Sequence, residues 1–283
     1  MRFKVFSSGS YGNSTVLKIN DKYILIDVGL SRKHILSELE KLGLSFEDIS
    51  FILITHEHSD HIKGLAQIIK DNIPIYMTKG TFDEAYNLYK KSKVKSDNFA
   101  ANLMLERFNF GGITLFEKLD NSILYKSINI EGIDIDILPC FHDAAETCGF
   151  VIHEGEKKLV YITDTGYVHE AVFPYITNAD IYILESNYDP EVLMASSRPY
   201  LTKKRILSDN GHMSNEDSMV ILSKVIGNKT KYVLHAHVSQ ECNIGLLIEQ
   251  TRKNVFNAYN VDTNGKTFVI LGPYPSEVFD IWK

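Results

Sequence analysis

The chain has 283 residues, of which 44% are hydrophobic, so it is long enough to bury a sizeable core. Its net charge is −6 and its pI is about 5.9, so no overall positive field marks it as a tight, nonspecific DNA binder. The three cysteines have no paired spacing, which favours a reducing cytoplasm over a disulfide scaffold. No apolar run reaches the length of a membrane span, and the first residues lack the apolar core of a secretion signal. We therefore expect a cytoplasmic protein with no membrane partner.

In chain order, the apolar pattern predicts strands at about 2–7, 14–19 and 23–27, a helix at 32–42, a strand at 51–54, and helices at 62–70 and 79–95. Strands are expected again at about 113–117, 122–126, 130–138, 148–153 and 158–163. The second half alternates strands at about 181–184 and 231–234 with helices near 215–226 and 244–256. Two strand sets flanked by helices predict an α/β fold, a four-layer αββα sandwich, in a single domain over residues 1–283. The segment 85–110 fits least well and is interpreted as a possible mobile insertion.

The most informative motif is the run His56-Glu57-His58-Ser59-Asp60-His61. It follows the apolar run 51–54, a predicted buried strand, so it lies on a rigid edge of the core. The spacing lets His56 and His58 face one metal ion while Asp60 and His61 turn toward a second. Imidazole and carboxylate groups suit Zn²⁺, and also Mn²⁺ or Fe²⁺. The alternative is an ordinary polar loop, but four coordinating groups in one short turn would repel one another without a cation.

This run resembles the His-x-His-x-Asp-His signature of the metallo-β-lactamase fold. The remaining groups of that family pattern occur in the same order, each just past a predicted strand: Asp27, His142, Asp164 and His237. The resemblance implies that Asp27 orders the metal loop without being a ligand. It also implies two divalent metal ions, Zn or Mn with Fe possible. The implied ligands are His56, His58 and His142 for the first ion, Asp60, His61 and His237 for the second, and Asp164 as a bridge between them.

Further motifs narrow the resemblance to one branch of the family. They are the segments 7–14, 163–167, 185–189, 211–217 and 237–243. This ordered set is similar to the WalJ (YycJ) branch of metallo-β-lactamase-fold hydrolases, whose site layout resembles that of ribonuclease Z. The resemblance implies a dinuclear metal-dependent phosphodiesterase, a DNA exonuclease working 5′ to 3′ with a metal-bridging hydroxide.

The chain departs from the branch pattern at two positions. The final ligand motif usually reads Leu-x-His-Leu-Ser, whereas here the segment 234–239 reads Leu-His-Ala-His-Val-Ser. His237 directly precedes Val238 and Ser239, so we expect His237 to be the ligand and His235 to be an additional histidine. The second departure is Tyr11, which stands where the branch often has a serine.

His212 lies in a Gly-His-Met-Ser loop similar to a ribonuclease Z loop in which the imidazole contacts the scissile phosphate. We therefore group His212 with Asp27 and Asp60 as catalytic candidates. The alternative is a surface histidine preceding a helix that Ser214 caps, with Asp217 in its first turn.

A basic, partly aromatic strip precedes this loop. Cations combined with one aromatic ring suit binding along a nucleic-acid backbone, although a solvated helix face explains a charge run equally well. The candidate substrate-binding residues are Tyr200, Lys203, Lys204 and Arg205.

Two other functions compete with a nuclease. The same metal site fits a small-molecule hydrolase that acts on a thioester, a lactone or a cyclic nucleotide, and the fold alone does not separate these substrates. A non-catalytic regulatory metal-binding protein is the other alternative, but the complete ligand set argues against it. The expected partner is DNA or another phosphodiester, and the sequence leaves the oligomeric state open.

Overall fold

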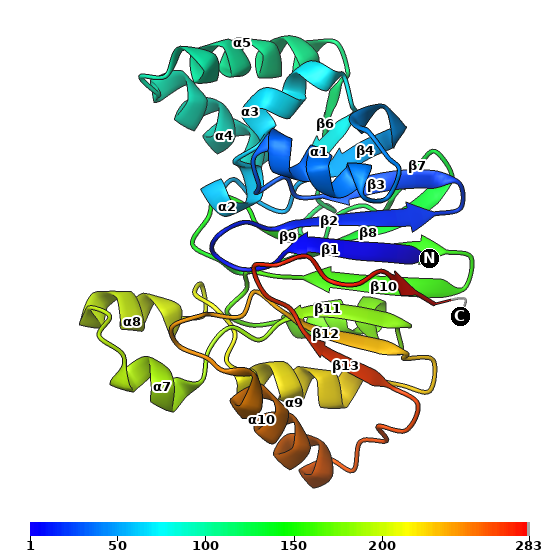
Figure 1. Ribbon diagram of the computed structural model, residues 1–283, viewed down its shortest axis with the longest axis vertical. Helices are drawn as coiled ribbons and strands as arrows, with labels where there is room; N and C mark the ends of the chain where they lie inside the picture. Colours follow the sequence, from blue (N-terminus) through cyan, green and yellow to red (C-terminus); the bar gives the residue numbers. More distant parts are fainter. Residues whose placement is uncertain (282–283) are drawn as a thin grey trace. The chain divides into compact units, whose positions relative to one another are not determined.

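The computed structural model describes residues 1–281, and its contacts divide the chain into two compact units. Unit 1 comprises residues 1–117, 144–147 and the tail from 273, and unit 2 comprises residues 118–143 and 148–272. Each unit contains one seven-stranded sheet with helices packed on it (Figure 1). The expected α/β class is therefore confirmed. The sequence analysis predicts one domain over residues 1–283. The chain passes between the two units several times, so no single linker divides it.

The two sheets share one pattern of strand directions. In each sheet three antiparallel pairings are followed by three parallel ones. In unit 1 the order is β14 (Phe279–Asp280), β1 (Arg2–Ser7), β2 (Ser14–Ile19), β3 (Lys22–Ile26), β4 (Ile49–Leu53), β5 (Ile75–Met77) and β6 (Ile113–Leu115). In unit 2 it is β7 (Ile128–Ile130), β8 (Ile133–Pro139), β9 (Cys148–Glu154), β10 (Lys157–Ile162), β11 (Ile181–Glu185), β12 (Tyr232–Ala236) and β13 (Thr267–Ile270).

The helices of unit 1 cover one face of its sheet. Leu25, Ile52 and Ile75 of the central strands pack with Leu39 and Met104 of the helices in one buried cluster. Strand residues that point to the opposite face are buried as well, which explains why these strands are continuous apolar runs. The helices are α1 (Arg32–Glu40), α2 (Ser59–Ile62), α3 (Leu65–Ile68), α4 (Lys79–Lys91) and α5 (Lys95–Asn109), with 3₁₀ turns at Phe46–Asp48 and Ile69–Asp71.

The segment interpreted as a possible insertion consists of α4 and α5, which lie side by side in Figure 1. The buried Arg107 of α5 anchors this pair. Its guanidinium donates hydrogen bonds to the carbonyl oxygens of Ile69, Ile73 and Gly112. One cation therefore satisfies three backbone acceptors that apolar neighbours would leave without partners.

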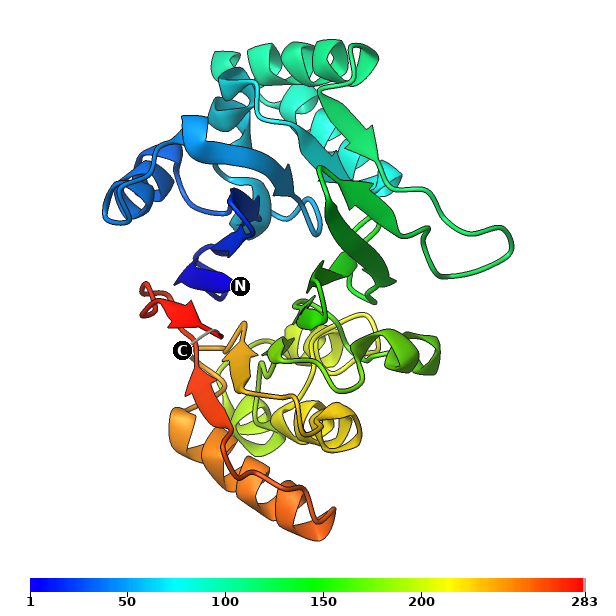
Figure 2. The ribbon, with the colours of Figure 1, turned by 90° about the vertical axis from the view of Figure 1, so that its right-hand side faces the viewer.

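The helices of unit 2 pack on its sheet in the same manner. Val160, Tyr182 and Val233 of β10 to β12 contact the cluster that contains Leu222 of α9 and Phe256 of α10. Figure 2 shows α10, in orange, beside the strands of this sheet. The helices are α6 (Phe173–Ile176), α7 (Pro190–Ala195), α8 (Tyr200–Ile206), α9 (Asn215–Val225) and α10 (Gly245–Ala258), with a 3₁₀ turn at Glu170–Val172. Over residues 1–281, no helix combines the length and hydropathy that a membrane crossing requires.

Three predicted elements differ from the structure. The predicted strand 122–126 is wrong, because this segment is irregular and only Tyr125 forms an isolated bridge, with Lys118. The predicted strand 130–138 is confirmed as β8 but begins too early, because Glu131 and Gly132, with φ angles of 52° and 87°, form the turn between β7 and β8. The predicted helix 62–70 is shorter, because α2 ends at Ile62 and the next helical segment is α3 with the 3₁₀ turn that follows it.

Candidate active site

Three of the predicted site residues occupy an uncommon backbone conformation at the ends of parallel strands. Asp27 follows β3, Asp164 follows β10 and His237 follows β12, with φ angles of 59°, 54° and 50°. This left-handed region is uncommon for residues other than glycine and costs about 1–3 kcal/mol at each position, so it persists only where the surroundings enforce it. The sheet ends therefore hold these three side chains in orientations that an ordinary strand exit does not provide.

In unit 1, the fully buried Asp27 carboxylate holds the loop of residues 55–61, which carries the metal motif and is called the metal-motif loop below. It accepts hydrogen bonds from the Thr55 amide (2.8 Å) and hydroxyl (2.9 Å), and it lies 2.8 Å from Nδ1 of His61. Burial raises the pKa of Asp27, and the charge and hydrogen bonds of His61 and Thr55 offset this only in part. Asp27 therefore makes the contacts expected of a residue that orders the loop.

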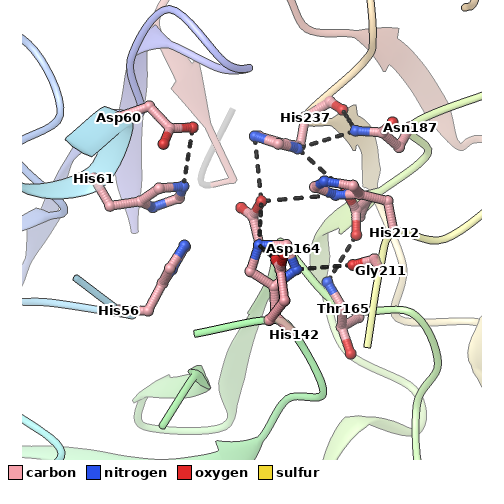
Figure 3. A network of polar contacts seen from close by, with 12 residues as sticks. His56, Asp60, His61, His142, Asp164, Thr165, Asn187, Gly211, His212 and His237 are labelled. Carbon is pink, nitrogen blue, oxygen red and sulfur yellow. Dashed lines mark hydrogen bonds and ion pairs between the residues drawn. The ribbon is translucent and has the colours of Figure 1, made fainter. Parts of the chain in front are cut away.

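The four coordinating groups of the motif gather in this one loop. The ring centroid of His56 lies 4.7 Å from that of His58 and 4.0 Å from that of His61. Asp60 lies beside His61, with 3.7 Å between Oδ2 and Nε2 (Figure 3). The Thr55 hydroxyl lies 3.1 Å from Nδ1 of both His56 and His61, so Nε2 is the nitrogen of each ring that lies away from Thr55.

Asn13 connects the glycine-rich N-terminal turn to the same loop. Its Nδ2 atom lies 2.9 Å from Nε2 of His61 and 3.3 Å from Oδ2 of Asp60. An imidazole nitrogen has one lone pair, so a metal ion at Nε2 of His61 would take the place of the Asn13 N–H. No local pattern identifies Asn13, because its role depends on a contact between residues 47 positions apart.

In unit 2, Glu185 at the end of β11 holds two imidazoles. Its Oε1 atom lies 2.7 Å from Nδ1 of His212 and 3.2 Å from Nδ1 of His237, and Oε2 accepts a hydrogen bond from the Thr165 amide. Burial opposes ionisation of Glu185, but the charge and hydrogen bonds of His212 and His237 outweigh it and hold its pKa below the usual range. Glu185 was not among the candidate residues, although its position at a parallel strand end is the same signal that identified Asp164.

Asp164 lies among three imidazoles of unit 2. Its Oδ1 atom is 3.3 Å from Nε2 of His237, 3.8 Å from Nε2 of His142 and 3.8 Å from Nδ1 of His212 (Figure 3). His142 donates its Nδ1 proton to the Gly211 carbonyl at 2.8 Å, and its Nε2 atom lies 3.2 Å from Oδ1 of Asp143. One ligand atom each from Asp164, Glu185, His212 and His237 lies within 4.8 Å of the others. This set of nitrogen and oxygen donors fits Zn²⁺ or Mn²⁺.

The helix cap on which the alternative interpretation of His212 rests is present in the structure. Ser214 caps α9, because its hydroxyl accepts a hydrogen bond from the Asp217 amide at 3.1 Å. The cap and the contact between His212 and Glu185 are therefore both present, and the cap fixes the chain that follows His212.

The two neighbouring histidines of β12 and its end have different environments. His237 contacts Glu185 and Asp164, whereas His235 belongs to none of the potential metal-binding groups in the described chain. His235 is 1% exposed, and neither ring nitrogen has a hydrogen-bond partner within residues 1–281. Burial, assisted by the charge of Arg252, lowers the pKa of His235 to about 3. His235 is thus a neutral histidine of the core.

The candidate substrate-binding strip divides into two kinds of residue. Lys203 donates hydrogen bonds to the carbonyls of Met194 and Ser196, which end α7, and Arg205 forms a 2.8 Å ion pair with Asp143. Lys204 is exposed and makes no hydrogen bond or ion pair within residues 1–281, and Tyr200 is 72% exposed. Only Lys204 and Tyr200 are therefore presented to solvent without an internal role.

The comparisons with known proteins agree with this geometry. The model of the beta-lactamase superfamily domain matches residues 22–236. The chain is 35% identical to exodeoxyribonuclease WalJ of Streptococcus pneumoniae over 89% of this chain and 87% of the relative. It is 34% identical to exodeoxyribonuclease YycJ of Bacillus anthracis over 86% of this chain and 84% of the relative. The fold is similar to that of human tRNase Z, short form, with a TM-score of 0.65, 16% identity and 99% of both chains covered, which confirms the predicted fold.

Replacing His235 with Leu should weaken the acid sensitivity of folding. The folded pKa of about 3 lies below the ordinary value of His, so the unfolded chain takes up a proton first as the pH falls. The neutral ring contributes to the free energy of unfolding above about pH 6.5. This contribution decreases by about 2 kcal/mol between pH 7 and pH 5. This part of the decrease should disappear in His235→Leu, as measured by urea unfolding at both pH values.

The exposed His34 provides a matched control, because His34→Ala removes a histidine without changing the core. His235→Leu should also keep the metal content of the wild type, whereas His237→Ala should lose metal. Loss of metal from His235→Leu with retention in His237→Ala would show that the ligand register is wrong.

Proposed function

Because the chain belongs to the beta-lactamase superfamily, and within it to the family of the exodeoxyribonucleases WalJ and YycJ, we propose that it is a phosphodiesterase that degrades DNA from one end. Its family identifies it as a metal-dependent hydrolase. The observation that carries the proposal is the set of imidazoles whose Nδ1 atoms have buried partners, namely His61 with Asp27, His142 with Gly211 and His237 with Glu185. This arrangement prepares the Nε2 atoms for metal ions.

The proposed ligands are those expected from the family pattern. His56, His58 and His142 would hold one divalent ion, Asp60, His61 and His237 a second, and Asp164 both. Zn and Mn are the proposed ions, with Fe as the alternative, because the donors are imidazole nitrogens and carboxylate oxygens. When bound, two such ions polarise a phosphodiester and lower the pKa of a coordinated water, which is the chemistry that its hydrolysis requires.

The protein's own residues orient the reacting groups. Glu185 occupies Nδ1 of His212 at 2.7 Å, so Nε2 is the atom that His212 offers to the scissile phosphate or to its leaving oxygen. Asp27 acts through Thr55 and His61 and is a positioning residue. Asp60 serves as a ligand whose carboxylate lies at the start of α2, where the helix favours negative charge.

The proposed substrate is DNA, degraded in the 5′-to-3′ direction expected from the sequence resemblance. Lys204 and Tyr200 would contact the backbone and the bases of the DNA. Lys203 and Arg205 instead hold α8 in place through their contacts with other parts of the chain. The three cysteines are free thiols, which supports the expected cytoplasmic setting.

The test of this function combines metal analysis with DNA digestion. The chain should bind two ions, and it should release nucleotides from duplex or single-stranded DNA labelled at either end, compared in Mn²⁺, Mg²⁺ and Zn²⁺. Asp164→Ala should lose activity and much of the metal, because it removes a ligand of both ions. A constant value of one ion after metal addition would contradict the dinuclear site, and undegraded DNA under all three metals would contradict the nuclease.

Replacing His212 with Ala should lower kcat on DNA by about 10²–10⁴-fold while the metal content stays the same, because general acid catalysis contributes on that order. The measurement is kcat and KM on DNA together with elemental analysis of the same protein. His34→Ala is the control and should match the wild type. Equal losses of metal and activity in His212→Ala would instead identify His212 as a ligand.

Replacing Lys204 with Ala should weaken DNA binding and reduce the salt slope of log K by about 0.7–0.9, because one phosphate contact releases about that much counterion. Lys203→Ala is the matched variant. It should leave the salt slope unchanged and lower the melting temperature, because Lys203 holds the carbonyls that end α7. An unchanged salt slope of log K in Lys204→Ala would show that the strip is only a solvated helix face.

A further inference from the structure

The N-terminal turn of unit 1 is closed by its own hydrogen bonds. The Gly12 amide donates to the Gly9 carbonyl at 2.9 Å, and the Gly9 amide donates to Oδ1 of Asn13 at 2.8 Å. Gly9 and Gly12 have φ angles of 128° and 154°, which other residues rarely adopt. Two glycines and one buried asparagine therefore fix the turn, and Ser10 and Tyr11 stand at its exposed tip.

The base of this turn is fixed to the metal-motif loop. The Asn13 amide donates to the Asp60 carbonyl at 2.7 Å, and the Gly29 amide donates to the Asn13 carbonyl at 2.9 Å. A Cβ atom at Gly29 would lie 1.6 Å from the Asp60 oxygen, so the three segments approach as closely as backbones can. Successive Cα atoms are about 3.8 Å apart, so the Cα atom of Tyr11 lies within about 7.6 Å of that of Asn13.

Tyr11 itself contributes nothing visible to the fold. Its side chain is 70% exposed, and it makes no hydrogen bond or ring contact within residues 1–281. A large ring held in water on a rigid turn loses little conformational entropy when a flat partner covers it. The face of a nucleobase is such a partner, and base stacking on aromatic side chains tolerates every base.

We propose that Tyr11 is a stacking platform for a nucleobase at the DNA end that enters the candidate site. The proposal rests on the proposed nuclease function and assigns Tyr11 a role in holding substrate. A stacking contact at a fixed position beside the Asp60 loop would hold the end of a flexible strand while the phosphodiester is cleaved. It would act on single-stranded ends of any sequence and would not act on a phosphodiester that carries no base.

The test compares Tyr11→Ser and Tyr11→Phe on single-stranded DNA and on an oligonucleotide of abasic tetrahydrofuran units, a reporter phosphodiester without aromatic rings. Tyr11→Ser should raise KM for DNA by about fivefold or more with kcat nearly unchanged, because stacking contributes at least that much in comparable sites. Tyr11→Phe should restore the wild-type KM, since the ring face and not the hydroxyl makes the contact. Neither variant should change the rate on the reporter or the melting temperature.

Tyr259 is the matched control, because it is 52% exposed at the C-terminal end of α10 and has no part in the candidate site. Tyr259→Ser should leave both substrates unaffected. An unchanged KM for DNA in Tyr11→Ser would overturn the proposal while leaving the nuclease function intact. A wild-type chain that cleaves the reporter and no DNA would overturn both. A KM that rises equally in Tyr11→Ser and Tyr11→Phe would assign the contact to the hydroxyl and would also reject stacking.

Discussion

The candidate residues of each unit depend on one fully buried carboxylate, Asp27 in unit 1 and Glu185 in unit 2. Removing a carboxylate from water costs several kcal/mol unless hydrogen bonds and opposite charge compensate. Each carboxylate is compensated by Nδ1 of an imidazole and by a backbone amide, from Thr55 or from Thr165. The same contacts fix the rings, so the interaction that makes burial tolerable also determines which nitrogen of each histidine is available for chemistry.

The strand directions explain why these carboxylates lie at strand ends. Asp27 and Asp164 follow β3 and β10, which have the same place in the order of the two sheets, and Glu185 ends the next parallel strand, β11. Side chains at the carboxyl ends of parallel strands lie at one edge of a sheet, where loops can be added without disturbing the core. The left-handed backbone at Asp27, Asp164 and His237 turns each chain sharply at that edge.

The sequence predicted the residues whose signals are local. The metal motif, the order of Asp27, His142, Asp164 and His237, and the cap at Ser214 all depend on short spacings or on a preceding strand. Asn13 and the internal contacts of Lys203 were missed because they depend on residues that are distant along the chain, whereas Glu185 was missed although it lies at the end of a predicted strand. The hairpin at Glu131 and Gly132 was missed because an apolar run on both sides concealed a two-residue turn.

The buried residues that hold the imidazoles and the exposed side chains differ in what they contribute. The residues that hold imidazoles are buried and interdependent, so replacing one of them would also disturb its neighbours. The exposed groups, Tyr11, Tyr200 and Lys204, have no hydrogen-bond or ion-pair partner within residues 1–281 and are free to differ between proteins that share the metal site. The hydrolytic chemistry therefore follows from the family, whereas the proposed contacts with the substrate use a few surface side chains that the fold does not require.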